Sequence, residues 1–206
     1  MLELRIQQHF IDSADLNYQA AQALGKPIAA AVQALLACVT AGGKVLACGS
    51  GRSAALAQAF AVQFVVRYER ERPELAAIAL GADAATLSAL ARDHGASAVF
   101  APSLRAVAAP GDVLLALCVD GRDAAVQAAV QAAHERDMTV VALTGAGSGA
   151  GSSAGGALAD LLRDTDVHIC VPSDRAARIH EVHLLALHCI VDAVDTQLLG
   201  EQELPS

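Results

Sequence analysis

The sequence predicts an α/β protein, a three-layer sandwich in which helices cover both faces of a five-stranded parallel sheet. Five short apolar runs of strand length alternate with stretches of helical spacing. Strands separated by helices are typically joined by right-handed crossovers within one parallel sheet. Of the 206 residues 54% are hydrophobic and only 3% are aromatic, which indicates an aliphatic core. This length suits a single domain, residues 1–206.

The N-terminal part of the chain, residues 1–41, predicts a helical arm ahead of the sheet. Residues 2–23 carry apolar side chains at mostly helical spacing. Gly25 and Pro27 then indicate a stop and a restart, and the apolar stretch Ile28–Thr40 predicts a second helix. We therefore expect a two-helix N-terminal arm.

The core, residues 42–200, carries the alternating pattern. The predicted strands are Lys44–Cys48, Ala76–Leu80, Asp112–Val119, Thr139–Thr144 and Val167–Val171. The predicted helices are Ser53–Tyr68, Ala84–Asp93, Ala124–Arg136 and Ala176–Leu199. No clear helix is predicted between the fourth and fifth strands. There the segment 145–156 contains only Gly, Ala and Ser, which predicts a loop serving as a slack connection or a binding lid.

Charge and cysteine content restrict the partners. The net charge of −8 argues against direct contact with nucleic acid, and the basic run Arg67–Arg72 alternates in sign, as a solvated, self-paired face would. The start of the chain lacks the apolar region of a signal peptide, and no apolar run reaches the roughly 18 residues of a membrane span. Five scattered cysteines without a CxxC pair indicate a reducing compartment, so we expect a cytoplasmic protein without a cofactor.

The turn after the first predicted strand is a candidate ligand site. Gly49, Ser50, Gly51, Arg52 and Ser53 form a glycine-serine turn directly before a helix, whose first N–H groups can bind an anion. The same residues fit a dinucleotide fingerprint, which also requires an acidic residue about 20 positions on, at the end of the second strand. No acidic residue ends that strand, so the dinucleotide interpretation is disfavoured.

Two further turns are expected at the same edge of the sheet. Asp120 and Asp123 follow the third strand, and Thr144 ends the fourth. Asp120 and Thr144 are candidate ligand-binding residues. A carboxylate within ~4 Å of a phosphate costs several kcal/mol, which Arg122 could partly offset. The two aspartates could instead cap the helix that follows, the commoner role at such positions.

The last predicted helix carries three histidines. His180, His183 and His188 do not have the spacing of a zinc-protease motif. At about 100° per residue His180 and His188 share one side of the helix, and His183 lies on the other side of His180. His180 and His188 are the candidate catalytic residues, with ordinary polar contacts as the alternative; no metal site is predicted.

Several segments together resemble the sugar isomerase (SIS) domain family, in order and over nearly the whole chain. They are Gly49–Ala55, Arg67–Pro73, Pro110–Leu115, Met138–Gly145, Val171–Ser173 and Ala177–His183. The resemblance is to the branch of the phosphoheptose isomerases and their non-enzymatic relative DiaA, which associates with the replication initiator DnaA. It implies a flavodoxin-like sheet and a homotetramer assembled through the N-terminal arm.

The sequence departs from this family at the residues that carry the chemistry. The isomerases that it resembles have a His and, four residues on, a Glu that bind zinc and serve proton transfer; these positions are Ala59 and Gln63 here. A Gln and a His on the family's last helix fall on His180 and His188. Proton transfer between carbons needs a base, and neither alanine nor glutamine can serve as one. The family's phosphate-binding turn is also altered, at 118–123.

These departures favour a non-catalytic protein over an enzyme. We predict a DiaA-like regulator of replication initiation that binds a phosphorylated sugar derivative, a protein partner such as DnaA, or both. The alternative is a phosphoheptose isomerase acting on sedoheptulose 7-phosphate, with a rearranged site built from the three histidines. A third hypothesis is a sugar-phosphate sensor that uses Ser50, Ser53 and Thr144.

Overall fold

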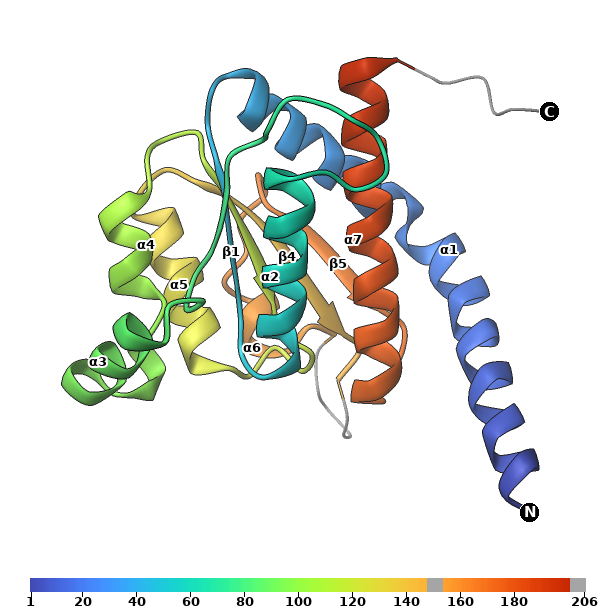
Figure 1. Ribbon diagram of the computed structural model, residues 1–206. Coiled ribbons are helices and arrows are strands. Elements are labelled where there is room, and N and C mark those ends of the chain that lie inside the picture. Colours follow the sequence, from blue (N-terminus) through green and yellow to red (C-terminus); the bar gives the residue numbers. More distant parts are fainter. Residues whose placement is uncertain (148–153, 201–206) are drawn as a thin grey trace.

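Five parallel strands form the sheet at the centre of the computed structural model, which describes residues 1–147 and 154–200 (Figure 1). The strands lie in the order β2-β1-β3-β4-β5. Their bounds are β1 (Val45–Gly49), β2 (Ala77–Ala79), β3 (Val113–Leu117), β4 (Thr139–Gly145) and β5 (Val167–Val171). All four strand pairings are parallel, as predicted from the alternation of strands and helices.

Seven helices connect and flank these strands in the described part of the chain. They are α1 (Leu2–Thr40), α2 (Arg52–Val65), α3 (Ala84–His94), α4 (Ala101–Val107), α5 (Ala124–His134), α6 (Gly156–Ala159) and α7 (Ala176–Leu199), with a 3-10 turn at Ala96–Ala98. The four predicted core helices are present. The sequence missed α4 and the four-residue α6, which follows β4. Part of the predicted Gly, Ala and Ser loop, 148–153, lies outside the described residues.

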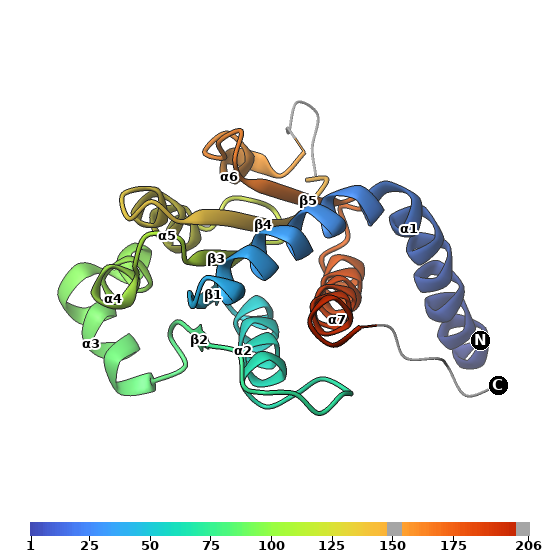
Figure 2. The ribbon, with the colours of Figure 1, turned by 90° about the horizontal axis from the view of Figure 1, so that it is seen from above.

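The sheet is covered on both faces, which confirms the three-layer sandwich. Val113, Leu115 and Leu117 of β3 pack towards the layer of α1, α2 and α7. Leu114 and Ala116, which alternate with them, pack towards α4 and α5. Figure 2 shows the sheet lying between α5 and α6 on one side and α2 and α7 on the other. Because both faces are buried, the strands are continuous apolar runs rather than alternating ones.

The N-terminal arm is one helix, not the two helices that Gly25 and Pro27 suggested. Helix α1 runs without a break over 39 residues and contains Pro27. A proline within a helix removes one hydrogen bond and crowds the preceding turn, so the helix bends instead of ending. Figure 2 shows that α1 changes direction along its length. Its second half packs on the sheet beside α7, and its first half projects away from it (Figure 1).

Helices α1 and α7 are long and apolar enough, by length and composition alone, to cross a membrane, although no run of that length was expected from the sequence. The core helix of a globular domain passes the same test. Here Ile179, Ile190 and Val191 of α7 are almost fully buried against the sheet and its covering helices. The apolar character of α7 is therefore explained by its packing against the sheet.

The basic run Arg67–Arg72 is only partly the solvated face that its alternating charges predicted. Arg67 pairs with Glu71 on the surface. The side chain of Arg72, in contrast, is only 1% exposed and forms an ion pair with Asp195 of α7, Nε to Oδ1 at 2.5 Å. This pair fastens the segment after α2 to α7 and so helps to hold these two helices side by side.

Candidate functional site

A pocket of about 380 Å³ opens at the carboxyl ends of β1 and β3. The chain leaves β1 for β2 on one side of the sheet and returns to β3 on the other, so the pocket lies where the strand order reverses. Open α/β sheets bind their ligands at this position. The pocket is lined by Ser50, Arg52, Ser53, Leu117, Cys118, Val119, Asp120, Asp123, Asp174, Ala176 and His180.

The β1–α2 turn brings the start of α2 close to the sheet. A Cβ atom at Gly49 would lie 2.7 Å from Ser53 Cβ and 2.9 Å from the carbonyl oxygen of Leu117, so only glycine fits there. Gly51 has a φ of 60°, in the left-handed region that favours glycine. The turn therefore places the N-terminus of α2 at the pocket, where the N–H groups of Ser53 and Ala54 donate to the carbonyl oxygens of Ser50 (3.1 Å) and Gly51 (3.2 Å). Of the predicted ligand residues, four line it: Ser50, Arg52, Ser53 and Asp120.

His180 faces this turn from α7 and has a defined orientation. Its Nδ1 lies 2.7 Å from the carbonyl oxygen of Ala176, which can only accept a hydrogen bond. In the neutral ring, Nδ1 therefore carries the hydrogen, and Nε2 keeps its lone pair. Nε2 lies 3.4 Å from the hydroxyl oxygen of the buried Ser53, which donates to it. The structure thus places Nε2 of His180 beside the predicted anion-binding turn.

Carboxylates make the opposite side of the pocket acidic. Asp123 caps α5, accepting from the N–H groups of Ala125 (2.8 Å) and Val126 (3.2 Å), which is the capping alternative considered from the sequence. Asp120 accepts from the N–H of Arg122 at 3.0 Å. Asp174, which sequence analysis missed, also lines the pocket. Sequence analysis could have identified Asp174 because it lies between the fifth strand and the last helix, at the carboxyl edge of the sheet.

Four candidate residues from the sequence do not line this pocket: Gly49 and Gly51, which shape the turn, and Thr144 and His188. The hydroxyl of Thr144 is fully buried and lies 2.7 Å from Nε2 of His168, on the face of the sheet opposite α7. His188 stacks beside Tyr68, with ring centroids 5.1 Å apart. It is eight residues beyond His180, roughly 12 Å along the helix axis. The shared side of α7 was predicted, but the two histidines are too far apart to act on the same atom.

His183 is also outside the pocket, and it is a structural residue. Its side chain is fully buried, and its Nε2 donates to the carbonyl oxygen of Thr144 at 3.1 Å. Burial lowers the pKa of His183 from 6.5 to about 4. The ring is therefore neutral at physiological pH, and it ties α7 to the end of β4.

This histidine predicts a stability that falls in acid. Between pH 6.5 and about 4 the unfolded chain binds a proton at this position and the folded chain does not. The unfolded state then binds more protons, so the free energy of unfolding falls as the pH falls, by about 3 kcal/mol for this group. Urea unfolding at pH 7 and pH 4.5 would measure the loss. His183→Gln introduces a neutral side chain that can still donate a hydrogen bond, so the free energy of unfolding should fall clearly less between these pH values than in the wild type. His94→Gln, at an exposed position, should lose as much free energy of unfolding as the wild type.

The residues of this chain do not fit the zinc site of the family that the sequence resembles. Ala59 offers no ligand atom, and Gln63 has a side-chain oxygen that is buried without a hydrogen-bond partner. Zinc sites are built from His, Cys and carboxylate ligands. Within residues 1–147 and 154–200, no group of three or more His, Cys, Asp or Glu side chains could hold a metal ion.

These features define a doubly wound α/β protein with its ligand pocket at the switch point of the sheet. The model of the SIS domain matches residues 9–145, and the chain belongs to this family. Phosphoheptose isomerases from Methylibium petroleiphilum and Azoarcus sp. are 61% and 50% identical to it, covering 99% and 97% of this chain and 98% of each relative. The solved phosphoheptose isomerase of Neisseria gonorrhoeae is 41% identical, with a TM-score of 0.87 over 95% of this chain and all of the other.

The similarity overturns the functional prediction. The sequence analysis favoured a non-catalytic, DiaA-like regulator of replication initiation, because the positions of two zinc ligands hold Ala59 and Gln63. The relatives that match over nearly their full length are phosphoheptose isomerases, so that prediction is wrong and the isomerase alternative is better supported. The error came from giving the substitutions at Ala59 and Gln63 more weight than the resemblance to phosphoheptose isomerases over nearly the whole chain. Contact with DnaA stays an untested prediction.

Proposed function

We propose that this chain is a sugar-phosphate isomerase that interconverts aldose and ketose forms, with sedoheptulose 7-phosphate as its substrate. The observation that carries the proposal is the position of His180 Nε2, which lies in the switch-point pocket 3.4 Å from Ser53 Oγ. The phosphoheptose isomerases that match the whole chain support the choice of substrate.

The β1–α2 turn would bind the phosphate. The N-terminus of a helix favours an anion through its free N–H groups and its dipole. Arg52 and the hydroxyl of Ser50 line the same end of the pocket and add a positive charge and a donor. Asp120 and Asp174, which would repel a phosphate, suit the hydroxyl groups of the sugar because a carboxylate accepts their hydrogen bonds.

His180 would move the proton. In the aldose-to-ketose direction, Nε2 accepts the proton from the carbon next to the carbonyl, and the carbonyl oxygen takes up a proton from solvent to give an enediol. The imidazolium then returns its proton to the former carbonyl carbon, and the second hydroxyl gives its proton to solvent as the new carbonyl forms. Histidine is the commonest side chain in this role because it accepts and releases protons near neutral pH. One base thus serves both proton transfers at carbon, and solvent exchanges the protons at the two oxygens.

Turnover in the presence of a chelator tests both the activity and its independence from metal. The purified chain should convert sedoheptulose 7-phosphate, and its rate should change by less than about twofold after dialysis against EDTA, because the pocket lacks a zinc ligand set. Product formation is followed by anion-exchange chromatography. Conversion that EDTA abolishes would reject the metal-free pocket, and no conversion at micromolar enzyme would reject the isomerase itself.

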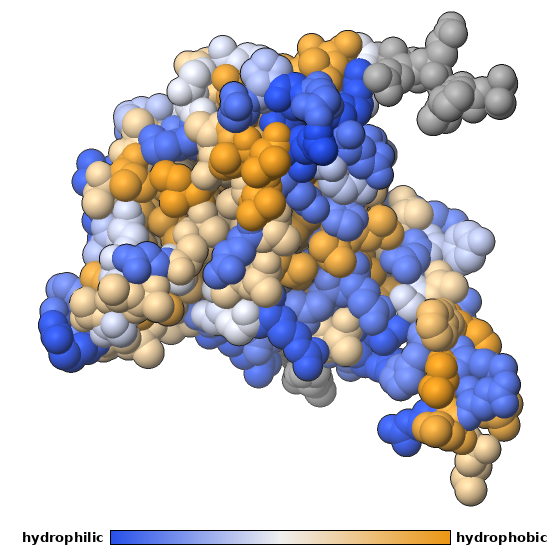
Figure 3. Space-filling view, in the orientation of Figure 1, coloured by the Kyte–Doolittle hydropathy of each residue, from blue (hydrophilic) through white to orange (hydrophobic). Residues whose placement is uncertain are grey.

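We also propose that the enzyme is a cytoplasmic homotetramer assembled through α1. The projecting half of α1 exposes Leu2, Leu4, Ile6 and Phe10. Figure 3 shows hydrophobic surface, in orange, on this projecting helix. Exposed apolar surface of this extent is typical of an interface. All five cysteines are free, which suits a reducing compartment. Light scattering should give four times the chain mass for the wild type and a lower mass for Ile6→Asp.

A further inference from the structure

The geometry points to Arg178 as a positioning residue for His180. We propose that a polar network between α1 and the start of α7, centred on this buried arginine, holds the first turns of α7 so that His180 keeps its basic nitrogen in the pocket. The catalytic part of this inference rests on the proposed isomerase function. Arg178 does not line the pocket itself and acts through the helix that carries His180.

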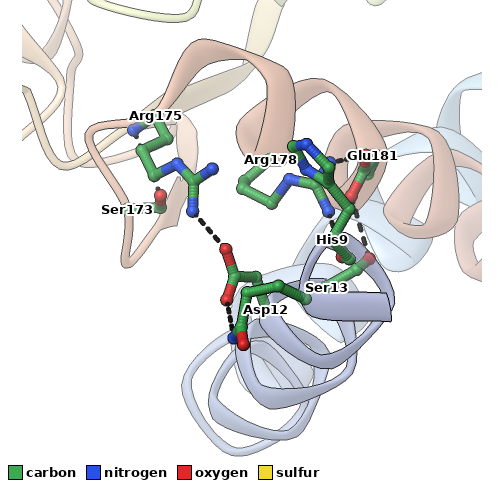
Figure 4. A network of polar contacts seen from close by, with 8 residues as sticks. His9, Asp12, Ser13, Ser173, Arg175, Arg178 and Glu181 are labelled. Atoms are coloured by element: carbon green, nitrogen blue, oxygen red, sulfur yellow. Dashed lines mark hydrogen bonds and ion pairs between the residues drawn. The ribbon is translucent and has the colours of Figure 1, made fainter. Parts of the chain in front are cut away.

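The network joins two segments that are more than 160 residues apart in sequence (Figure 4). Arg178 donates to the carbonyl oxygen of His9 at 2.9 Å and pairs with Glu181 at 2.7 Å. Glu181 accepts from the hydroxyl of Ser13 at 2.9 Å. A second link, from Arg175 to Asp12 at 2.7 Å, ties the residue that precedes α7 to the same part of α1.

The arginine is the buried centre of this network. Only 9% of Arg178 is exposed, whereas Arg175 is an exposed residue. Exposed ion pairs contribute little, at most about 1 kcal/mol, so the link between Arg175 and Asp12 is secondary. A buried guanidinium that bridges a carbonyl and a carboxylate is restrained more strongly. The buried residues of α1 begin only at Leu16, so these polar contacts are the attachment of the turns before Leu16 to α7.

Arg178 and His180 lie on nearly opposite sides of α7. They are two residues apart, which is about 200° around the helix, while Ala176 and His180 are about 40° apart. Helix α1 therefore contacts one side of the first turns of α7, and the pocket lies on the opposite side. The carbonyl of Ala176, which fixes the hydrogen of His180 on Nδ1, belongs to the turn that Arg178 anchors. A shift of that turn would loosen this hydrogen bond and release the ring.

The test compares Arg178→Met and Arg178→Lys with the wild type. Arg178→Met keeps an unbranched, flexible side chain but removes the guanidinium and both of its polar links. We expect kcat to fall about tenfold with KM within about twofold, because the phosphate turn is untouched and only the base is displaced. Arg178→Lys, which keeps one donor and the charge, should recover part of the loss. Arg92→Met, which removes an exposed pair on α3, is the matched control and should keep wild-type kcat.

A second readout does not depend on turnover. Heteronuclear NMR of labelled imidazole nitrogens, with His180 assigned from the signal lost in His180→Gln, reports which nitrogen carries the hydrogen. The wild type should show the hydrogen on Nδ1, and Arg178→Met should show a mixture of the two forms. Ser13→Ala is a milder change in the same network and should also increase the share of the ring with its hydrogen on Nε2. This variant provides the test if Arg178→Met does not fold.

The outcomes separate this inference from the proposed function. A changed hydrogen position in a protein without isomerase activity would sustain the positioning role and reject the isomerase. Unchanged imidazole signals in both Arg178→Met and Ser13→Ala would overturn the positioning role. So would a loss of thermal stability in Arg178→Met with wild-type kcat, because that result would make Arg178 purely structural.

Discussion

Replacing His180 with glutamine will lower kcat/KM for sedoheptulose 7-phosphate by about a thousandfold, because the pocket loses its base. Glutamine is close to histidine in size, and its amide cannot accept a proton from carbon. The substitution is informative because glutamine stands at the matching position in the isomerases that the sequence resembles. In this chain Ala59 and Gln63 stand at the positions where those isomerases have His and Glu. A glutamine at position 180 would therefore not restore their zinc site.

Steady-state kinetics with a coupled or chromatographic assay measures this effect. The matched control is His188→Gln on the same helix, which should stay within about threefold of the wild type because His188 stacks on Tyr68 outside the pocket. Ser53→Ala should fall between the two, since it removes the hydroxyl that donates to His180 Nε2 at 3.4 Å. A His180→Gln enzyme with more than a third of wild-type kcat/KM would show that the base lies elsewhere.

The fold was predictable because each strand is an apolar run bounded by polar or glycine residues. Val167–Val171 and Ala176–Leu199 were predicted with their observed bounds. Helix α4 was missed because it is seven residues long, too short for a periodic pattern to be recognised. The continuity of α1 was missed because packing of its second half on the sheet outweighs the effect of Pro27.

The site was predictable to the level of segments, not of side-chain direction. The turn at Gly49–Ser53 was recognised because glycine and serine before a helix have a known chemistry. Thr144 was misplaced because its direction depends on the alternation within β4, which turns its hydroxyl towards His168. The orientation of His180 depends on the carbonyl of Ala176 and on the neighbouring α2, and no sequence pattern encodes it.

Replacing Arg72 with methionine will destabilise the fold by about 3–5 kcal/mol, because it leaves the carboxylate of Asp195 buried without a partner. The side chains of this pair are only 1% and 2% exposed. Arg72 also donates to the carbonyl oxygens of Phe64 at 2.8 Å and Gln63 at 2.7 Å. The second oxygen of Asp195 is buried and has no hydrogen-bond partner among the described residues, so Arg72 is its principal source of compensation.

Urea unfolding of single and double variants measures this coupling. The double variant Arg72→Met with Asp195→Leu should be more stable than Arg72→Met alone, because it removes the unpaired charge and adds apolar packing. Arg105→Met, which breaks a half-exposed pair with Glu135, is the control and should cost less than about 1 kcal/mol. If Arg72→Met cost no more than this control, the buried pair would not be what holds α2 against α7. The distance between Ser53 and His180, on these two helices, would then have to be maintained by the apolar contacts around Phe60 and Ile190.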